Sequence, residues 1–179
     1  MKVGRIGSFT PWKLVMAELI SATLPVESLD GEMEALFGPI DYAGPPMAFT
    51  QTDYYHEEMG GSLTRRFVSF RTPVLPDRLA EIKILTNGLE EKHAVDGRRR
   101  VNLDPGILNL SRFVLATTKD NSHRIPLRDG IYAELTLQYA RRDFQVLPWT
   151  YPDYALREYR DILLEIREIL KKEGKRGGT

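Results

Sequence analysis

The order of strand-like and helical segments up to residue 118 is the feature that most constrains the fold of this chain. Short runs of β-branched, aromatic and other apolar residues predict strands, whereas apolar residues spaced three or four positions apart predict helices. The resulting order is strand, helix, strand, strand, helix, strand. The segments are residues 14–20, 29–37, 47–52, 63–74, 75–89 and 112–118.

Two crossover units of this kind in series predict an α+β fold with a ferredoxin-like βαββαβ sheet. Residues 123–127 and 131–139 predict a hairpin that extends this sheet. Apolar side chains recur every three or four positions over residues 156–170, which predicts a C-terminal amphipathic helix packed on the sheet. We expect a single domain over residues 1–179, of which 171–179 form a frayed polar tail.

Glycine and proline mark the expected breaks between these segments. The Asp104-Pro105-Gly106 sequence matches a type II turn. Asn87-Gly88 is expected to end or kink the second helix. At the Arg128-Asp129-Gly130 turn of the hairpin, two registers are available, and they differ in the length of the loop.

A two-residue loop in this hairpin would place Ile125 opposite the charged Glu134. A three-residue loop, with Gly130 in the left-handed conformation, pairs Ile125 with Ala133 and Leu127 with Ile131. The same register places Arg124 opposite Glu134. We favour this second register because apolar residues then meet apolar residues.

The charge balance and the absence of cysteine exclude several classes of protein. The chain has 25 basic and 25 acidic side chains and no cysteine. There can therefore be no disulfide framework, thiolate metal cluster or cysteine nucleophile. Zero net charge argues against a nucleic-acid-binding surface. Glu18 interrupts the apolar stretch of residues 14–24, so we expect no membrane span or export signal, and a cytoplasmic location.

Searches for nucleotide-binding motifs are negative. The sequence has no Gly-x4-Gly-Lys-Ser/Thr P-loop and no Gly-x-Gly-x-x-Gly dinucleotide motif. It also lacks a Gly-x-Ser-x-Gly nucleophile elbow. A divalent metal held by oxygen and imidazole ligands is the cofactor class that this residue inventory leaves open.

Three polar segments contain the candidate functional residues. In the first, Asp53 is a candidate metal ligand and Tyr55 a candidate ligand-binding residue; the alternative is a solvated loop. In the second, Asn102 is a candidate for ligand binding and Asp104 for metal binding; the alternative is turn chemistry.

The third segment, residues 118–124, combines hydroxyls, cations and turn amides, as an anionic or phosphorylated ligand requires. Lys119 and Arg124 would hold the anion, and His123 or Glu134 would act as the acid or base. The alternative is a polar turn in which Arg124 pairs with Glu134 across the hairpin.

Five segments together resemble a known family. They are Phe49-Thr-x-Thr-Asp-Tyr-Tyr55, Gly97-Arg-Arg-Arg-Val-Asn-Leu-Asp-Pro-Gly106, Leu115-Ala-Thr-Thr-Lys-Asp-Asn-Ser-His-Arg-Ile125, Asp129-Gly-Ile-Tyr-Ala-Glu134 and Trp149-Thr-Tyr-Pro-Asp-Tyr154. In this order they resemble the prokaryotic domain-of-unknown-function family 4416 over nearly the whole chain. The resemblance carries no activity. It implies that any site is assembled from these five segments.

Two functional hypotheses follow. The first is a binding protein or enzyme that acts on an anionic or phosphorylated small molecule or a nucleotide. The second is a non-enzymatic interaction or regulatory domain that forms a homo-oligomer or binds a protein or RNA through an exposed sheet face or edge.

Overall fold

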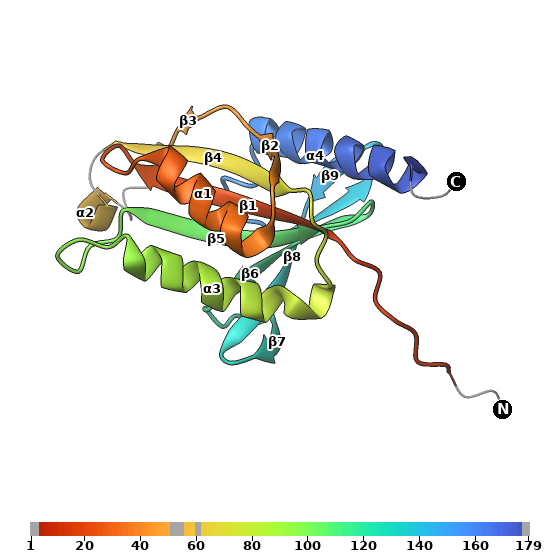
Figure 1. Cartoon of the computed structure of the whole chain (residues 1–179). Coiled ribbons are helices and arrows are strands. Elements are labelled where there is room, and N and C mark those ends of the chain that lie inside the picture. Colours follow the sequence, from red (N-terminus) through yellow and green to blue (C-terminus); the bar gives the residue numbers. More distant parts are fainter. Residues whose placement is uncertain (1–3, 51–55, 60–61, 177–179) are drawn as a thin grey trace.

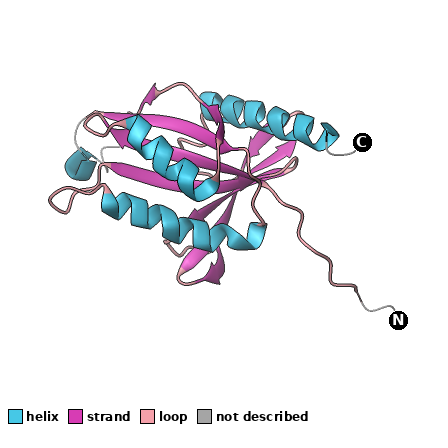
Figure 2. Ribbon diagram, in the orientation of Figure 1, coloured by secondary structure: helices cyan, strands magenta, loops and turns pink. Residues whose placement is uncertain are grey.

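One antiparallel sheet with helices on both faces forms the body of the protein (Figures 1 and 2). The computed structural model describes residues 4–50, 56–59 and 62–176. The helices and strands are, in chain order, β1 (Lys13–Ser21), α1 (Val26–Phe37), β2 (Ile40–Ala43), β3 (Met47–Ala48), α2 (His56–Met59), β4 (Leu63–Phe70), a 3-10 turn (Pro76–Arg78), α3 (Leu79–Lys92), β5 (Val101–Leu108), β6 (Arg112–Thr117), β7 (Ile125–Arg128), β8 (Ile131–Ala140), β9 (Asp143–Val146) and α4 (Arg157–Arg176).

The strand order is β2-β4-β1-β5-β6-β8-β7, with β3 paired to β4 and β9 paired to β8. Every pairing is antiparallel. β4 lies between β1 and β2, the two strands joined through α1, and β1 lies between β4 and β5, the two joined through α3. Two split β-α-β units therefore interlock, and the predicted α+β class is confirmed.

The central strand β1 is buried along its whole length and supplies side chains to the core on both faces of the sheet. Leu14 and Met16 pack with α1 and α3, whereas Val15 and Ala17 pack with the apolar stripe of α4. Apolar residues at every position of a strand are typical of a strand covered on both sides, whereas alternation is typical of a strand with one wet face.

The expected turn at Asp104-Pro105-Gly106 and the expected end of the second helix at Asn87-Gly88 are both wrong. The Asp104-Pro105-Gly106 segment is not a turn but lies within β5, where all three residues pair with β1. Pairing with the buried β1 outweighs the local turn preference of proline and glycine. Helix α3 also continues through Gly88 to Lys92, because Leu89 on its last turn is anchored in the core.

The predicted pairing of Ile125 with Ala133 is confirmed, but the loop length differs from the predicted one. Its loop has two residues, with φ of 55° at Asp129 and 74° at Gly130. Arg128 therefore pairs with Ile131, and the predicted Leu127–Ile131 pair is wrong. A bulge between Pro126 and Arg128 in β7 absorbs the extra residue and restores the apolar pairing.

The C-terminal region contains two further differences from the sequence prediction. Strand β9 was not expected, because its turn with β8 is made by Arg141 and Arg142, both at positive φ, where glycine or asparagine is the usual signal. Helix α4 continues to Arg176, so residues 171–176 are helical rather than a frayed tail. Glu173 on this last stretch accepts a hydrogen bond from the buried Lys13 Nζ at 3.0 Å.

β5 and β6 separate along their length. β5 pairs with β1 from Val101 to Leu108 but with β6 only from Gly106 to Leu108. Pro105, which has no N–H to donate, occupies the last position of β5 before the β6 pairing begins. Gly106 is required at this branch, because a Cβ there would lie 2.4 Å from Phe113 Cζ. The aromatic ring of β6 thus packs directly over the β5 backbone.

A buried ion cluster joins α1 to the sheet. Glu18 in β1 is 0% exposed and accepts a hydrogen bond from Arg66 Nε at 2.7 Å. Arg66 also donates to Asp30 of α1, with Nη1 3.0 Å from Oδ2. Burial raises the pKa of Glu18 to about 7, although Arg66 opposes the rise. The second carboxylate oxygen of Glu18 has no hydrogen-bond partner among the described residues.

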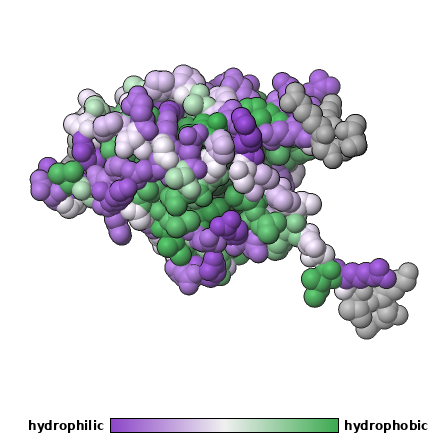
Figure 3. Space-filling model, viewed as in Figure 1, coloured by the Kyte–Doolittle hydropathy of each residue, from purple (hydrophilic) through white to green (hydrophobic). Residues whose placement is uncertain are grey.

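The face that carries α1 and α3 shows an apolar area on its surface (Figure 3). Leu36 of α1, Ile84 of α3 and Leu75, just before α3, are exposed. The edge strand β7 adds Ile125 and Leu127.

We expect Gly106→Ala to destabilise the protein by about 2 kcal/mol or more, because the new methyl group must displace the Phe113 ring in a close-packed core. The matched control is Gly31→Ala in α1, where a Cβ meets nothing within 4 Å. This control should be neutral or stabilising by up to about 1 kcal/mol. Urea unfolding of both variants measures the difference, and equal stabilities would contradict the proposed close packing.

We expect Glu18 to make the protein less stable as pH rises. Its pKa is 4.5 in the unfolded chain and about 7 when folded, so the stabilising proton uptake is complete below pH 4.5 and is lost as pH rises through 7. Between about pH 5 and about pH 8 the wild type should lose on the order of 2 kcal/mol relative to Glu18→Gln, whose side chain does not titrate. A pH series of urea unfolding curves tests this. Parallel pH profiles for the two proteins would refute it.

Candidate functional site

A cavity of about 950 Å³ lies where β5 and β6 separate. Residues of α3 line one side of it, and residues 151–154 line the other. Between them the wall is formed by the first half of β5, the end of β6 and Glu134 of β8. Because the sheet is open at this point, side chains from both faces of the sheet line the same cavity.

Nine charged side chains line this cavity. The cations are Arg65, Lys83, Arg99 and Lys119. The carboxylates are Glu90, Glu91, Asp104, Glu134 and Asp153. Such a concentration of charge next to a sheet core is costly in free energy unless the charges are paired or serve a function.

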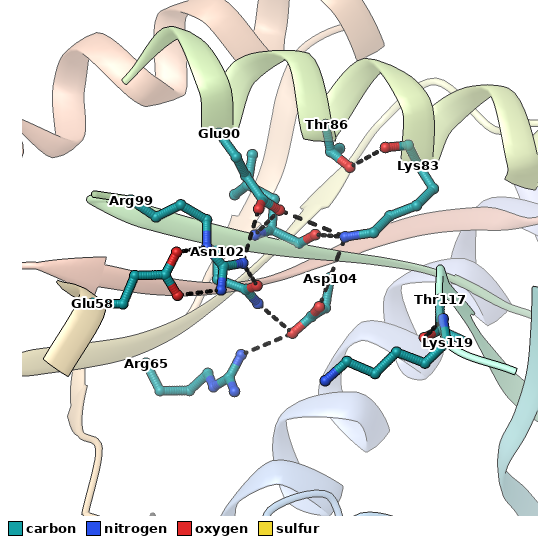
Figure 4. A network of polar contacts seen from close by, with 11 residues as sticks. Glu58, Arg65, Lys83, Thr86, Glu90, Arg99, Asn102, Asp104, Thr117 and Lys119 are labelled. Carbon is teal, nitrogen blue, oxygen red and sulfur yellow. Dashed lines mark hydrogen bonds and ion pairs between the residues drawn. The ribbon is translucent and has the colours of Figure 1, made fainter. Parts of the chain in front are cut away.

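Asp104 of β5 is the point at which several of these groups meet (Figure 4). Its Oδ2 accepts a hydrogen bond from Asn102 Nδ2 at 2.9 Å. The Arg65 guanidinium lies 3.6 Å from the same oxygen, and Lys83 Nζ lies 4.0 Å from Oδ1. The side chain of Lys119 extends toward this group from the end of β6 (Figure 4). The Asp104 side chain stays 29% exposed.

Arg65 is the most deeply buried of the cations, at 2% exposure. Its Nη2 donates to Asp153 Oδ2 at 3.1 Å, and its guanidinium lies 5.1 Å from the centre of the Phe49 ring. Nε and Nη1 have no hydrogen-bond acceptor within the described parts of the chain. Burial raises the pKa of Asp153, and the nearby Asp104 raises it further, whereas Arg65 lowers it.

Lys83, Glu90 and Arg99 form the α3 side of the network (Figure 4). Lys83 Nζ donates to the Leu103 carbonyl at 2.7 Å, and Glu90 accepts from the Leu103 N–H at 2.8 Å. Arg99 donates to Glu90 at 3.2 Å, to Asn102 at 2.9 Å and to both carboxylate oxygens of Glu58. Burial raises the pKa of Glu90 despite the nearby Lys83. These contacts fix the conformation of β5 beside the cavity.

Glu134 of β8 forms a second polar group on the opposite side. It is 1% exposed, and its Oε2 accepts from Arg124 Nε at 2.9 Å and contacts His123 Nε2 at 3.0 Å. Arg124 also donates to the Lys119 carbonyl at 2.8 Å and to the Tyr151 hydroxyl. The His123 ring stacks on Trp149, with 5.4 Å between ring centres. Arg124 and His123 therefore fix the position of the Glu134 carboxylate.

The structure brings several of the sequence-predicted residues together. Asn102, Asp104, Lys119 and Glu134 line the cavity. Arg124 and His123 do not line the cavity but contact Glu134, which does. The predicted Arg124–Glu134 pair across the hairpin is confirmed. Asp53 and Tyr55 lie outside the described residues.

Sequence reasoning missed Arg65, Lys83 and Asp153. Arg65 was hidden inside a strand-like run and Lys83 inside a helix pattern. A signal was present in both cases, because a charged residue at a position where the pattern demands an apolar one is itself informative. Asp153 lies in the Trp149–Tyr154 segment of the family resemblance, which was expected to contribute to a site, but it was not named as a candidate residue.

The surroundings of Asp104 bear on the metal hypothesis. Arg65 and Lys83 are cations, and a further cation at this carboxylate would be repelled by both. Over the described ranges, no group of three His, Asp or Glu side chains is arranged to hold a metal ion. The cationic hydrogen-bond donors around Asp104 fit an anion better than a metal ion.

The fold and the site define an α+β domain with a charged cavity between two separated strands. The chain belongs to the family described as "Domain of unknown function (DUF4416)", whose model matches residues 10–170. No curated protein and no solved structure matches the chain. Within the described residues, no helix is long and apolar enough to cross a membrane.

We expect the Arg124–Glu134 pair to be strongly coupled in stability. Arg124→Met leaves Glu134 buried without its cation and should cost about 3 kcal/mol, and Glu134→Gln should cost a similar amount. The double variant should lose at least about 1 kcal/mol less than the sum, which a double-mutant cycle measures by urea unfolding. The control pair is the exposed Arg157–Asp161, for which we expect additive effects close to zero. Additive losses at 124 and 134 would contradict the coupling.

Proposed function

We propose that the cavity between β5 and β6 binds a small anionic molecule, such as a phosphorylated compound or a nucleotide, as a ligand-binding domain or an enzyme. One observation carries the proposal: basic side chains from three different elements point toward one partly exposed carboxylate, Asp104. Arg65 comes from β4, Lys83 from α3 and Lys119 from the end of β6 (Figure 4). A stable core alone would favour apolar residues at the buried positions of Arg65 and Lys83.

The distances within the wall support an anion. The Asp153–Arg65, Glu90–Arg99 and Glu134–Arg124 pairs are made at 3.1, 3.2 and 2.9 Å. The contacts of Asp104 with Arg65 and Lys83 are longer, at 3.6 and 4.0 Å. These two cations therefore retain capacity for an additional acceptor near Asp104.

The proposal gives each predicted residue a role. Lys119, together with Arg65, would hold the anion, and Asn102 would orient Asp104 through its hydrogen bond of 2.9 Å. Glu134 would be the acid or base that faces the ligand, and His123 would share its proton. Arg124 would act by positioning Glu134, because its own hydrogen bonds go to Glu134, the Lys119 carbonyl and Tyr151.

The interaction hypothesis has separate support in the apolar surface over α1 and α3 and in the exposed edge strand β7 (Figure 3). A homo-oligomer or a protein partner would cover this surface. We also infer that the β2-β4-β1-β5 part of the sheet follows the ferredoxin-like plan, which the two interlocked split units support.

We expect a panel of anions to raise the melting temperature. A ligand at about 100 times its Kd contributes about 2.7 kcal/mol, which corresponds to roughly 5 °C or more for a chain of this size. Lys119→Met should reduce this shift by at least half, because it removes a cation from the cavity wall but keeps the apolar stem. The control is Lys172→Met on the exposed face of α4, which should leave the shift intact.

Differential scanning fluorimetry with phosphate, sugar phosphates and nucleotides provides the measurement. If no anion stabilises the wild type, or if Lys119→Met retains the full shift, the anion-binding proposal is wrong. An absence of any shift would favour the interaction hypothesis.

A further inference from the structure

The two polar groups of the cavity lie on either side of β6. Asp104 and Glu134 lie on the same face, because Gly106 of β5 and Glu134 of β8 both pair with Leu115 of β6. β6 therefore lies between them, and two strand spacings amount to about 10 Å. β5 and β6 no longer pair at the level of Asp104, so the separation of the two backbones there is larger. A ligand that contacts both ends must be longer than a simple inorganic anion.

The Asp104 end is rich in hydrogen-bond donors. Arg65, Lys83 and Lys119 gather there, and Nη1 of Arg65 lacks a hydrogen-bond acceptor among the described residues. The hydroxyl of Tyr154, which is buried in the same wall, also lacks a partner within these residues. A phosphate group offers three terminal oxygens and up to two negative charges, so it can accept from more of these donors than a carboxylate can.

The Glu134 end has the opposite character. The charge of Glu134 is already balanced by Arg124 at 2.9 Å, and His123 contacts the same oxygen at 3.0 Å. Among the described residues, the other oxygen, Oε1, accepts a single long hydrogen bond, from the Thr136 hydroxyl at 3.4 Å. A carboxylate oxygen in this state has room to accept a hydrogen bond from a neutral hydroxyl group. A second cation would gain little there, because the charge is already neutralised.

From this arrangement we propose that the ligand is a phosphorylated sugar, with its phosphate at the Arg65–Lys119 end and a sugar hydroxyl donating to Glu134 Oε1. The inference rests on the proposed anion-binding function and specifies its ligand class. A free sugar phosphate and the ribose phosphate of a nucleotide share this chemistry. The cavity, at about 950 Å³, can contain either of them.

Isothermal titration calorimetry on the full chain tests the proposal with four probes: ribose 5-phosphate, 2-deoxyribose 5-phosphate, adenosine monophosphate and inorganic phosphate. Ribose 5-phosphate or the nucleotide should bind at least about tenfold more tightly than inorganic phosphate. Whichever of the two binds more tightly identifies the source of the sugar phosphate. A gain for ribose 5-phosphate over its 2-deoxy analogue would assign a hydroxyl contact without any change to the protein.

Two variants locate the contacts. Glu134→Gln should reduce the preference for the sugar phosphate over inorganic phosphate, because a neutral amide oxygen accepts a weaker hydrogen bond from a hydroxyl than a carboxylate does. Lys119→Met should weaken the binding of both, and Lys172→Met should weaken neither. If Glu134→Gln does not fold, the wild-type comparison of ribose 5-phosphate with its 2-deoxy analogue and with inorganic phosphate tests the hydroxyl contact without a variant.

The outcomes separate the two proposals. Equal affinity for inorganic phosphate and both sugar phosphates, or a preference for sugar phosphates that is undiminished in Glu134→Gln, overturns the sugar-phosphate assignment and leaves the anion site in place. Failure of every phosphate probe, together with an absence of thermal shifts for all other anions, overturns both.

Discussion

The loss of pairing between β5 and β6 is the constraint on which the site depends. A continuous ladder would close the sheet and leave no cavity, so the point at which pairing stops determines what can line the opening. Gly106 and Pro105 set that point: the glycine admits the Phe113 ring against the strand, and the proline has no N–H with which to continue the pairing. Where β5 and β6 no longer pair with each other, β5 still pairs with β1 and β6 still pairs with β8.

The opening also explains why so many charges can be buried near the core. Along β5, backbone groups on the side that faces away from β1 have no partner strand before Gly106. Side chains provide part of the replacement, since Glu90 accepts from the Leu103 N–H and Lys83 donates to the Leu103 carbonyl. The side chains that stabilise the unpaired edge of β5 therefore also belong to the cavity wall. Lys83 and Glu90 stabilise the unpaired edge, whereas Asp104 and Glu134 lie on either side of β6.

The protein contains a second buried ion cluster, at Glu18, Arg66 and Asp30, which differs from the cavity in an informative way. It lies between α1 and the sheet, and none of its three residues lines the cavity. Its effect is on stability, because the burial that raises the pKa of Glu18 also makes ionisation costly. Buried charge alone is therefore insufficient to identify a functional site in this fold, and the cavity supplies the additional criterion.

The sequence by itself determined the α+β class, the positions of α1, α3 and α4, and the pairing of Arg124 with Glu134, because periodicity and short-range hairpin geometry are local properties. It also identified four residues of the cavity wall, Asn102, Asp104, Lys119 and Glu134, from their polar segments. Only the tertiary structure decided that Asp104, Pro105 and Gly106 continue a strand, since pairing with the buried β1 overrides their turn preference. Only the tertiary structure shows that Arg65, Lys83 and Asp153 converge on the cavity, because this convergence depends on contacts between residues far apart in the chain.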